Sequence, residues 1–300
     1  MTSYVVVLTL LAILTQQKVD ANNPVIVGGA PADPNEWPWM VWFGSSPTGF
    51  SCGGSLIHAQ YVVTAAHCVC RDGEYNKRRN KDRCKVFRTF YVHLGDHNRR
   101  TETDGTEVTI ASVDFWVHPD RHDIAVIKLS SAAPLSAAIQ PIPIAPGDPA
   151  VGTFAWATGW GAWTEGATDY PDILQELEML VRECTTVRTS TYGYLLPEDH
   201  TCVVKLDDDQ FRGTCFGDSG GPLVYQANGE WVLAGCTSHG INKGDCDIPN
   251  GWTIYVSVPV MRPWIEQVVP LNGGGGGGGD TTTAPPATTT KCKGGWKRGC

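Results

Sequence analysis

The sequence of 300 residues lacks two features that would place it in large classes of protein. It has no excess of positive charge, since its net charge is −8, and general nucleic-acid binding needs a basic face. Its apolar run over residues 4–14 is too short to cross a bilayer, and no later run is long and apolar enough. We therefore expect neither a nucleic-acid partner nor a membrane span.

The eleven cysteines lack the spacing that metal sites use. There are no paired Cys-x-x-Cys motifs and no Cys/His cluster of the zinc-finger kind, so disulfides are the better interpretation. Disulfides persist in oxidising compartments.

The apolar run over residues 4–14, with Val19 and Ala21 after it, predicts a signal peptide over 1–21, although the usual basic residues before the run are missing. The alternative is a hydrophobic first strand. We expect a secreted, extracellular protein.

The composition changes after residue 270. Residues 271–290 run from a glycine tract into a Thr/Pro-rich stretch, which is typical of a flexible linker followed by an O-glycosylated stalk. Residues 291–300 are basic and too few to form a core, so Cys292 and Cys300 are expected to close a small disulfide loop. This loop either contacts an anionic surface or is the remnant of a longer module, and we favour the second interpretation.

Between these ends the chain has no apparent internal repeat. Short runs such as YVVTAA, DIAVIKL and EWVLAGCTS alternate with Gly, Pro, Asn and Asp. Many short strands separated by turns predict an all-β sandwich or barrel. The last helical candidate covers residues 258–269, and Pro263 should limit how early this helix begins.

One serine stands among three glycines in CFGDSGGPLVY, residues 215–225. A serine hydroxyl becomes a nucleophile when an imidazole takes its proton and a third group holds that imidazole. His67 follows a strand-like run and precedes a cysteine, whereas Asp123 opens an apolar strand where a carboxylate must be hydrogen-bonded. Each of these residues, taken alone, also has a purely structural interpretation, which for His67 is the more common one.

Five motifs in this sequence stand in the order seen in chymotrypsin/trypsin-like serine proteases: IVGG from Ile26, TAAHC ending at Cys68, DIAVIKL from Asp123, TGWG from Thr158 and GDSGGP from Gly217. The sequence resembles this family over about residues 26–269. The resemblance implies two six-stranded antiparallel β-barrels with an active site in the cleft between them and a short C-terminal helix. It also implies a propeptide over 22–25 and a protease domain over 26–270.

The resemblance assigns a role to each residue that matches a motif. Ser219 would attack the scissile carbonyl, His67 would carry the proton, and Asp123 would orient His67. The backbone N–H groups of Gly217 and Ser219 would form an oxyanion hole. Ser238 matches the serine that supports the buried aspartate.

The resemblance also implies a disulfide pattern. Three pairs match the family: Cys52–Cys68, Cys184–Cys202 and Cys215–Cys246. Cys70–Cys84 would be an additional bridge, which leaves Cys236 unpaired in an apolar strand, where cysteine behaves as a small hydrophobe.

The substrate pocket departs from the trypsin pattern. Gly213 stands where trypsin-like members have an aspartate that selects Arg or Lys. With Gly240 and Thr253 on the walls, the resemblance implies an uncharged pocket of medium or restricted depth, as in chymotrypsin or elastase. Residues 238–240 would pair with the substrate backbone.

Three charged residues close in sequence to the predicted pocket or to its disulfide leave other substrate specificities open. Arg212 would favour acidic side chains if it turned inward, and Asp245 or Asp247 would favour basic ones. His239 replaces the tryptophan that usually stands beside the cleft.

The stretch GDHNRRTETDGTEV resembles a calcium loop. Asp96, Asp104 and Glu107 would supply the hard oxygen ligands that Ca²⁺ prefers. The alternative is a solvated acidic hairpin. We expect catalysis to need no cofactor, with structural calcium as the one ion under consideration.

Activation is implied by the resemblance as well. Cleavage before Ile26 would free an α-amino group that pairs with Asp218, and this buried ion pair would order the loop at Gly217. Because NNPV precedes Ile26, trypsin has no site there, whereas Val25 suits an elastase-like protease, including another copy of this one.

We therefore expect a secreted, monomeric serine endopeptidase, made as a zymogen and digestive in role. Its partners would be protein or peptide substrates and protease inhibitors. One alternative is a regulatory cascade protease, whose long pro-region with an interaction module is missing. Another is a binding or matrix protein on a protease scaffold, which would normally lack a residue of the triad, yet none is missing here.

Overall fold

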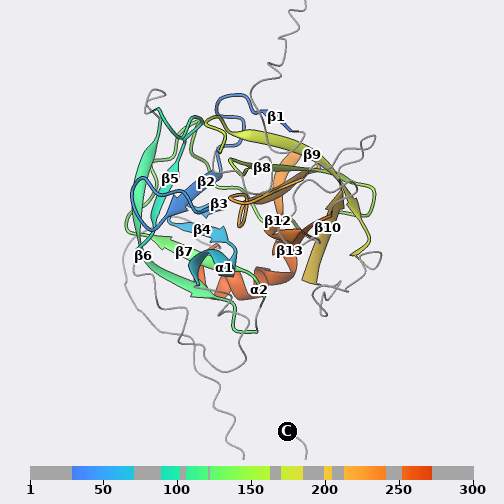
Figure 1. The fold of residues 1–300 in the computed structure, drawn as a ribbon. Helices are drawn as coiled ribbons and strands as arrows, with labels where there is room; N and C mark the ends of the chain where they lie inside the picture. Colours follow the sequence, from blue (N-terminus) through green and yellow to red (C-terminus); the bar gives the residue numbers. More distant parts are fainter. Residues whose placement is uncertain are drawn as a thin grey trace, which may run out of the picture.

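The computed structural model describes residues 29–70, 89–101, 106–120, 122–162, 170–184, 199–204, 213–240 and 252–271. Within these ranges the chain forms two closed antiparallel β-barrels that lie side by side (Figure 1). The expectation of two six-stranded barrels is confirmed. The predicted signal peptide, propeptide and basic tail lie outside the described residues, as does the predicted linker from residue 272 onward.

The first barrel has the strand order β2-β3-β4-β7-β6-β5, and it closes because β5 pairs with β2. Its strands are β2 (Met40–Gly44), β3 (Cys52–His58), β4 (Tyr61–Thr64), β5 (Tyr91–Leu94), β6 (Val108–Val117) and β7 (Ala125–Leu129). Register shifts interrupt the pairing in β3 and in β6. Such bulges increase the local twist and bend, which closing a small barrel requires.

The second barrel has the order β9-β10-β13-β12-β11-β8, and it closes because β8 pairs with β9. Its strands are β8 (Phe154–Gly159), β9 (Gln175–Arg182), β10 (His200–Val204), β11 (Pro222–Ala227), β12 (Glu230–Gly240) and β13 (Thr253–Ser257). The short strand β1 (Ala30–Pro31) pairs with β9 as an addition to this barrel. The segment that leads into the first barrel is therefore attached to the second.

Two helices accompany the barrels in the described part of the chain. The first, α1 (Ala66–Val69), follows β4 and was not expected from the sequence. The second, α2 (Val258–Val268), has Ser257 as its N-cap, whose hydroxyl accepts the N–H of Val260. Neither has the length and apolarity of a membrane-crossing helix.

The expectation that Pro263 limits how early the C-terminal helix begins is wrong. Helix α2 begins five residues earlier, and Pro263 lies inside it. The hydrogen bond that Pro263 cannot donate would end on the carbonyl of Pro259 in the first turn. Burial compensates for this loss, because Val258, Met261 and Ile265 are all buried.

The two barrels are held together by aromatic packing and by backbone hydrogen bonds. Trp37, just before β2, has its ring centroid 5.0 Å from that of Trp231 in β12. On the segment after β5, the N–H of Arg99 donates to the carbonyl of Asp172 at 2.9 Å. These contacts fix the position of one barrel relative to the other, and therefore also the two sides of any site at their junction.

Candidate active site

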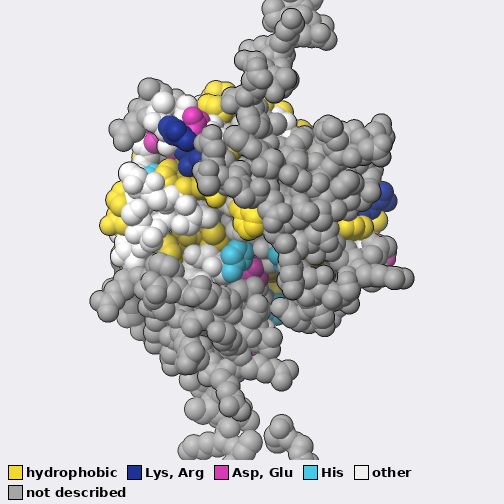
Figure 2. All heavy atoms as spheres, in the orientation of Figure 1, with side chains coloured by type: hydrophobic (Ala, Val, Ile, Leu, Met, Phe, Trp, Pro, Cys, Tyr) yellow, Lys and Arg dark blue, Asp and Glu magenta, His cyan; other side chains and the backbone are white. Residues whose placement is uncertain are grey.

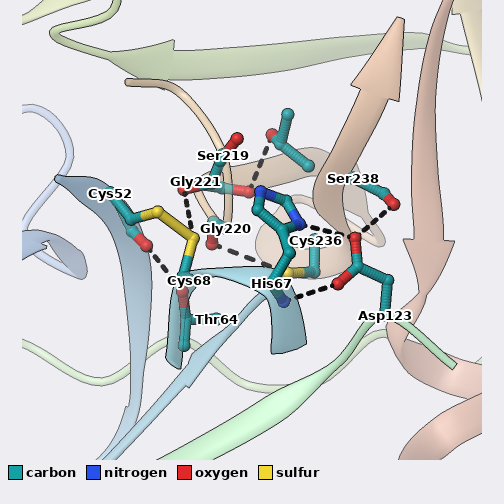
Figure 3. Close-up of a disulfide and its surroundings, with 12 residues drawn as sticks. Cys52, Thr64, His67, Cys68, Asp123, Ser219, Gly220, Gly221, Cys236 and Ser238 are labelled. Carbon is teal, nitrogen blue, oxygen red and sulfur yellow. Dashed lines mark hydrogen bonds and ion pairs between the residues drawn. A yellow bond between two sulfur atoms is a disulfide. The ribbon is translucent and has the colours of Figure 1, made fainter. Parts of the chain in front are cut away.

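The pairing of β4 with β7 brings His67 and Asp123 together, although 56 residues separate them. His67 lies in α1, directly after β4, and Asp123 lies just before β7. The Nδ1 atom of His67 is 2.7 Å from Oδ2 of Asp123, and the His67 backbone N–H donates to Oδ1 at 2.9 Å (Figure 3). The carboxylate thus holds both the backbone and the ring of His67.

This pair is stabilised against the cost of burial. Burial raises the pKa of Asp123, but the charge of His67 and the hydrogen bonds from His67 and Ser238 outweigh it, so the pKa is lowered. Burial likewise lowers the pKa of His67, and attraction and hydrogen bonding to Asp123 reverse this, so the pKa is raised. Asp123 is therefore a carboxylate, and the imidazole directs Nδ1 toward it.

Ser219 reaches this pair from the second barrel. Its carbonyl accepts the N–H of Gly53 at 2.9 Å and lies 3.6 Å from Sγ of Cys68, the residue after His67. In Figure 3 the ring of His67 lies between Ser219 and Asp123. Figure 2 shows histidine and acidic side chains together near the middle of this face. The structure thus brings Ser219, His67 and Asp123 to one place.

The glycines around Ser219 permit this close approach. Gly217 has φ +99° and Gly220 has φ +78°, a region that L-residues with a Cβ rarely adopt. A Cβ on Gly220 would also lie 2.1 Å from Oγ1 of Thr64 in the first barrel. The loop can therefore contact the first barrel only if residue 220 is glycine. The backbone amides of Gly217 and Ser219 lie on this same loop, two residues apart.

Asp218 is buried beside Ser219, with 1% of its surface exposed. Its carboxylate accepts the N–H of Gly161 at 2.8 Å and the N–H of Cys215 at 2.9 Å. Burial raises the pKa of Asp218 to about 7 in spite of these two bonds. A Cβ on Gly159 or Gly161 would collide with this carboxylate, which explains both glycines of the TGWG motif. Ile26, its expected partner, lies outside the described residues.

The predicted pocket residues come together at the ends of β12 and β13. Gly240 pairs with Thr253, whose hydroxyl accepts a hydrogen bond from Thr214 at 3.4 Å, one residue after the buried Gly213. Among the residues that the structure describes, a Cβ on Gly240 would meet only the Trp252 carbonyl, at 3.7 Å. The alternative determinants, Arg212, Asp245 and Asp247, lie outside the described residues.

The structure contains the expected disulfides Cys52–Cys68 and Cys184–Cys202. Cys70 and Cys215 are also disulfide-bonded. Their expected partners Cys84 and Cys246 lie outside the described residues, as do Cys292 and Cys300. Cys236 is a free, buried cysteine in β12.

The predicted calcium ligands fall partly outside the described residues. Oδ2 of Asp96 accepts the indole N–H of Trp42 at 2.7 Å, which gives this carboxylate a structural partner. Glu107 is half-buried, and Asp104 lies outside the described residues. Within the described ranges, one group of potential metal ligands is close enough to share an ion, and it consists of Cys52, His67 and Cys68. Its two cysteines form a disulfide with each other. Calcium binding stays a prediction.

The sequence identified Ser238 but not the contact that His239 makes with it. The Ser238 hydroxyl donates to Oδ2 of Asp123 at 2.6 Å, and its Oγ also lies 3.0 Å from Nδ1 of His239. The sequence signal was the His-for-Trp difference at position 239. Strand alternation, however, would place the side chains of adjacent residues on opposite faces.

Comparisons with known proteins agree with this geometry. The chain matches the Trypsin family over residues 26–265. It is 34% identical to a tryptase of Mus musculus, covering 82% of this chain and 89% of that protein. It is 35% identical to brachyurin of Leptuca pugilator, covering 80% and 97%. Among solved structures it resembles neuropsin, a serine protease expressed in the limbic system of mouse brain, with a TM-score of 0.65, 26% identity and coverage of 80% and 98%.

The electrostatic coupling of His67 to Asp123 can be tested directly. Asp123→Asn removes the charge but keeps the size of the side chain. The pKa of His67 should then fall below its ordinary value of 6.5, because burial acts without the opposing attraction. An NMR titration of the His67 ring proton measures this pKa. Asp120→Asn, which changes an exposed carboxylate nearby, is the control. A His67 pKa that does not change in Asp123→Asn would contradict the coupling.

Proposed function

Because this chain belongs to the trypsin family of serine proteases, we propose that it cleaves peptide bonds through Ser219, His67 and Asp123. The observation that supports this assignment is the hydrogen-bonded pair of His67 and Asp123 on the first barrel. The Ser219 loop of the second barrel is hydrogen-bonded to the same barrel through Gly53. The chain is a serine endopeptidase by family, and the proposal concerns which of its residues perform the steps.

In the proposed mechanism, Oγ of Ser219 attacks the scissile carbonyl and passes its proton to Nε2 of His67. Asp123 stabilises the imidazolium and keeps Nδ1 of the ring directed away from the serine. The N–H groups of Gly217 and Ser219 stabilise the oxyanion of the tetrahedral intermediate. His67 then gives the proton to the leaving amine, and water hydrolyses the acyl-enzyme by the same steps. No cofactor takes part.

Ser219→Ala tests the nucleophile. The substitution deletes the attacking oxygen and changes little volume, so kcat for peptide hydrolysis should fall by about 10⁶-fold while the melting temperature stays close to that of the wild type. Ser130→Ala, at an exposed serine, is the matched control and should keep full activity. Near wild-type turnover in Ser219→Ala would exclude the mechanism.

For specificity, we propose an uncharged pocket formed by Gly213, Gly240 and Thr253. Its support is that Gly213 offers no charge and that no described side chain stands within 4 Å of a Cβ placed on Gly240. Cleavage should therefore follow Leu, Phe, Met or small aliphatic residues.

A peptide library reads this preference. Gly240→Val should shift cleavage toward small aliphatic residues, because its Cβ meets no described atom closer than 3.7 Å and its methyl groups narrow the pocket. A strong preference of the wild type for Arg or Lys would contradict the proposal and implicate Asp245 or Asp247. A preference for acidic residues would implicate Arg212.

We also propose that the protein is secreted, digestive and made as a zymogen. Disulfides, which persist outside the reducing cytosol, support secretion. A regulatory role in a cascade is the alternative. The support for a zymogen is Asp218, because a new α-amino group at Ile26 would give this buried carboxyl the cation that lowers its pKa.

Activation should occur by cleavage of Val25–Ile26 in trans. Incubating the Ser219→Ala precursor with a trace of active enzyme should produce a new N-terminus at Ile26, because Val25 suits an uncharged pocket. Trypsin should not produce it. N-terminal sequencing distinguishes the results, and an intact Val25–Ile26 bond would show that this enzyme does not activate itself.

A further inference from the structure

A β-bulge in β12 directs two adjacent side chains to the same side of the strand. Thr237 pairs with Tyr255 and His239 pairs with Ile254, so Ser238 is an extra residue with no counterpart in β13. In a regular strand adjacent side chains point to opposite faces, whereas a bulge re-aims one of them. The result is that Nδ1 of His239 lies 3.0 Å from Oγ of Ser238.

The chemistry of the three groups sets the direction of these hydrogen bonds. The Ser238 hydroxyl has one proton, and its Oγ lies 2.6 Å from Oδ2 of Asp123. An ionised carboxylate only accepts hydrogen bonds, so the Ser238 proton must go to Asp123. The contact with His239 can then be a hydrogen bond only if Nδ1 carries a proton and donates it to Oγ.

We propose that His239 is a positioning residue for the catalytic pair. The hydrogen bonds form one chain, from Nδ1–H of His239 to Ser238, from Ser238 to Asp123, and from His67 to Asp123. A hydroxyl that accepts one hydrogen bond becomes a stronger donor for the next, so the N–H of His239 strengthens the bond that holds Asp123. For catalysis, this inference rests on the function proposed above.

The surroundings keep His239 neutral, which this role requires. Burial lowers its pKa to about 4, Asp123 opposes the shift, and His200 of β10 and His67 of α1 reinforce it. The ring therefore carries a single N–H at neutral pH, and the hydrogen bond to Ser238 selects Nδ1 as its site. A cation at this position would compete with His67 for the charge of Asp123.

Three variants separate donation by Nδ1 from the space that the ring fills. His239→Asn places an amide N–H near the position of Nδ1, His239→Gln places it near Nε2, and His239→Phe keeps a ring without a donor. The substrate should be a small ester that fills only the pocket at Ser219. Since one neutral hydrogen bond is worth about 1 kcal/mol, kcat should fall about fivefold in the Gln and Phe variants, with little change in KM. The Asn variant should stay within about twofold.

The pH profile gives a second measurement. A weaker Ser238–Asp123 bond makes Asp123 more basic, so it holds the proton of His67 more tightly. The acid limb of kcat/KM should therefore move to higher pH in His239→Gln and stay in place in His239→Asn. If the Asn and Gln variants are impaired alike, or if only KM changes, His239 merely lines the cleft and the proposal is wrong.

A failure of the proposed function would look different. If the wild-type enzyme hydrolyses no ester or peptide, an NMR titration of His67 in the full-length wild type and the three variants still tests the chain of hydrogen bonds. A His67 pKa that rises in His239→Gln and not in His239→Asn would support it. The same pKa in all four proteins would overturn it.

Discussion

A buried carboxylate at the junction of the two barrels constrains the rest of this structure. Asp123 is 7% exposed, and an ionised group so far from water must be hydrogen-bonded on all sides. Its donors come from both halves of the molecule, because His67 belongs to the first barrel and Ser238 to the second. The charge is therefore stable only while the barrels are docked, and the same docking orients the imidazole.

A second constraint is the approach of the Ser219 loop to the first barrel. The N–H of Gly53 donates to the Ser219 carbonyl, and the Thr64 hydroxyl donates to the Gly53 carbonyl. The Cys52–Cys68 disulfide links the strand of Gly53 to the residue after His67. These contacts leave no room for a side chain at Gly220. Cross-linking and close packing thus hold the Ser219 loop against the segment that carries His67.

Asp218 illustrates a buried charge with weaker compensation. Two backbone amides solvate its carboxylate, yet burial still raises its pKa to about 7. The contrast with Asp123, whose pKa is lowered, follows from the partners, since an imidazole and a hydroxyl join the amide at Asp123. The pKa values of two buried aspartates are therefore shifted in opposite directions by the partners that each one has.

The strand-forming runs of the sequence by themselves predicted a chain of many short β-strands. The order of its motifs, through their resemblance to a known family, predicted the two barrels and the disulfides Cys52–Cys68 and Cys184–Cys202, because such motifs are local features of the chain. Only the tertiary structure decided the helix α1 around His67, the continuation of α2 through Pro263 and the pairing of Asp96 with Trp42. It also decided the contact of His239 with Ser238, since a bulge depends on the register between two strands. Propensity and alternation are properties of a few neighbouring residues, whereas register and burial depend on segments that meet only when the barrels close.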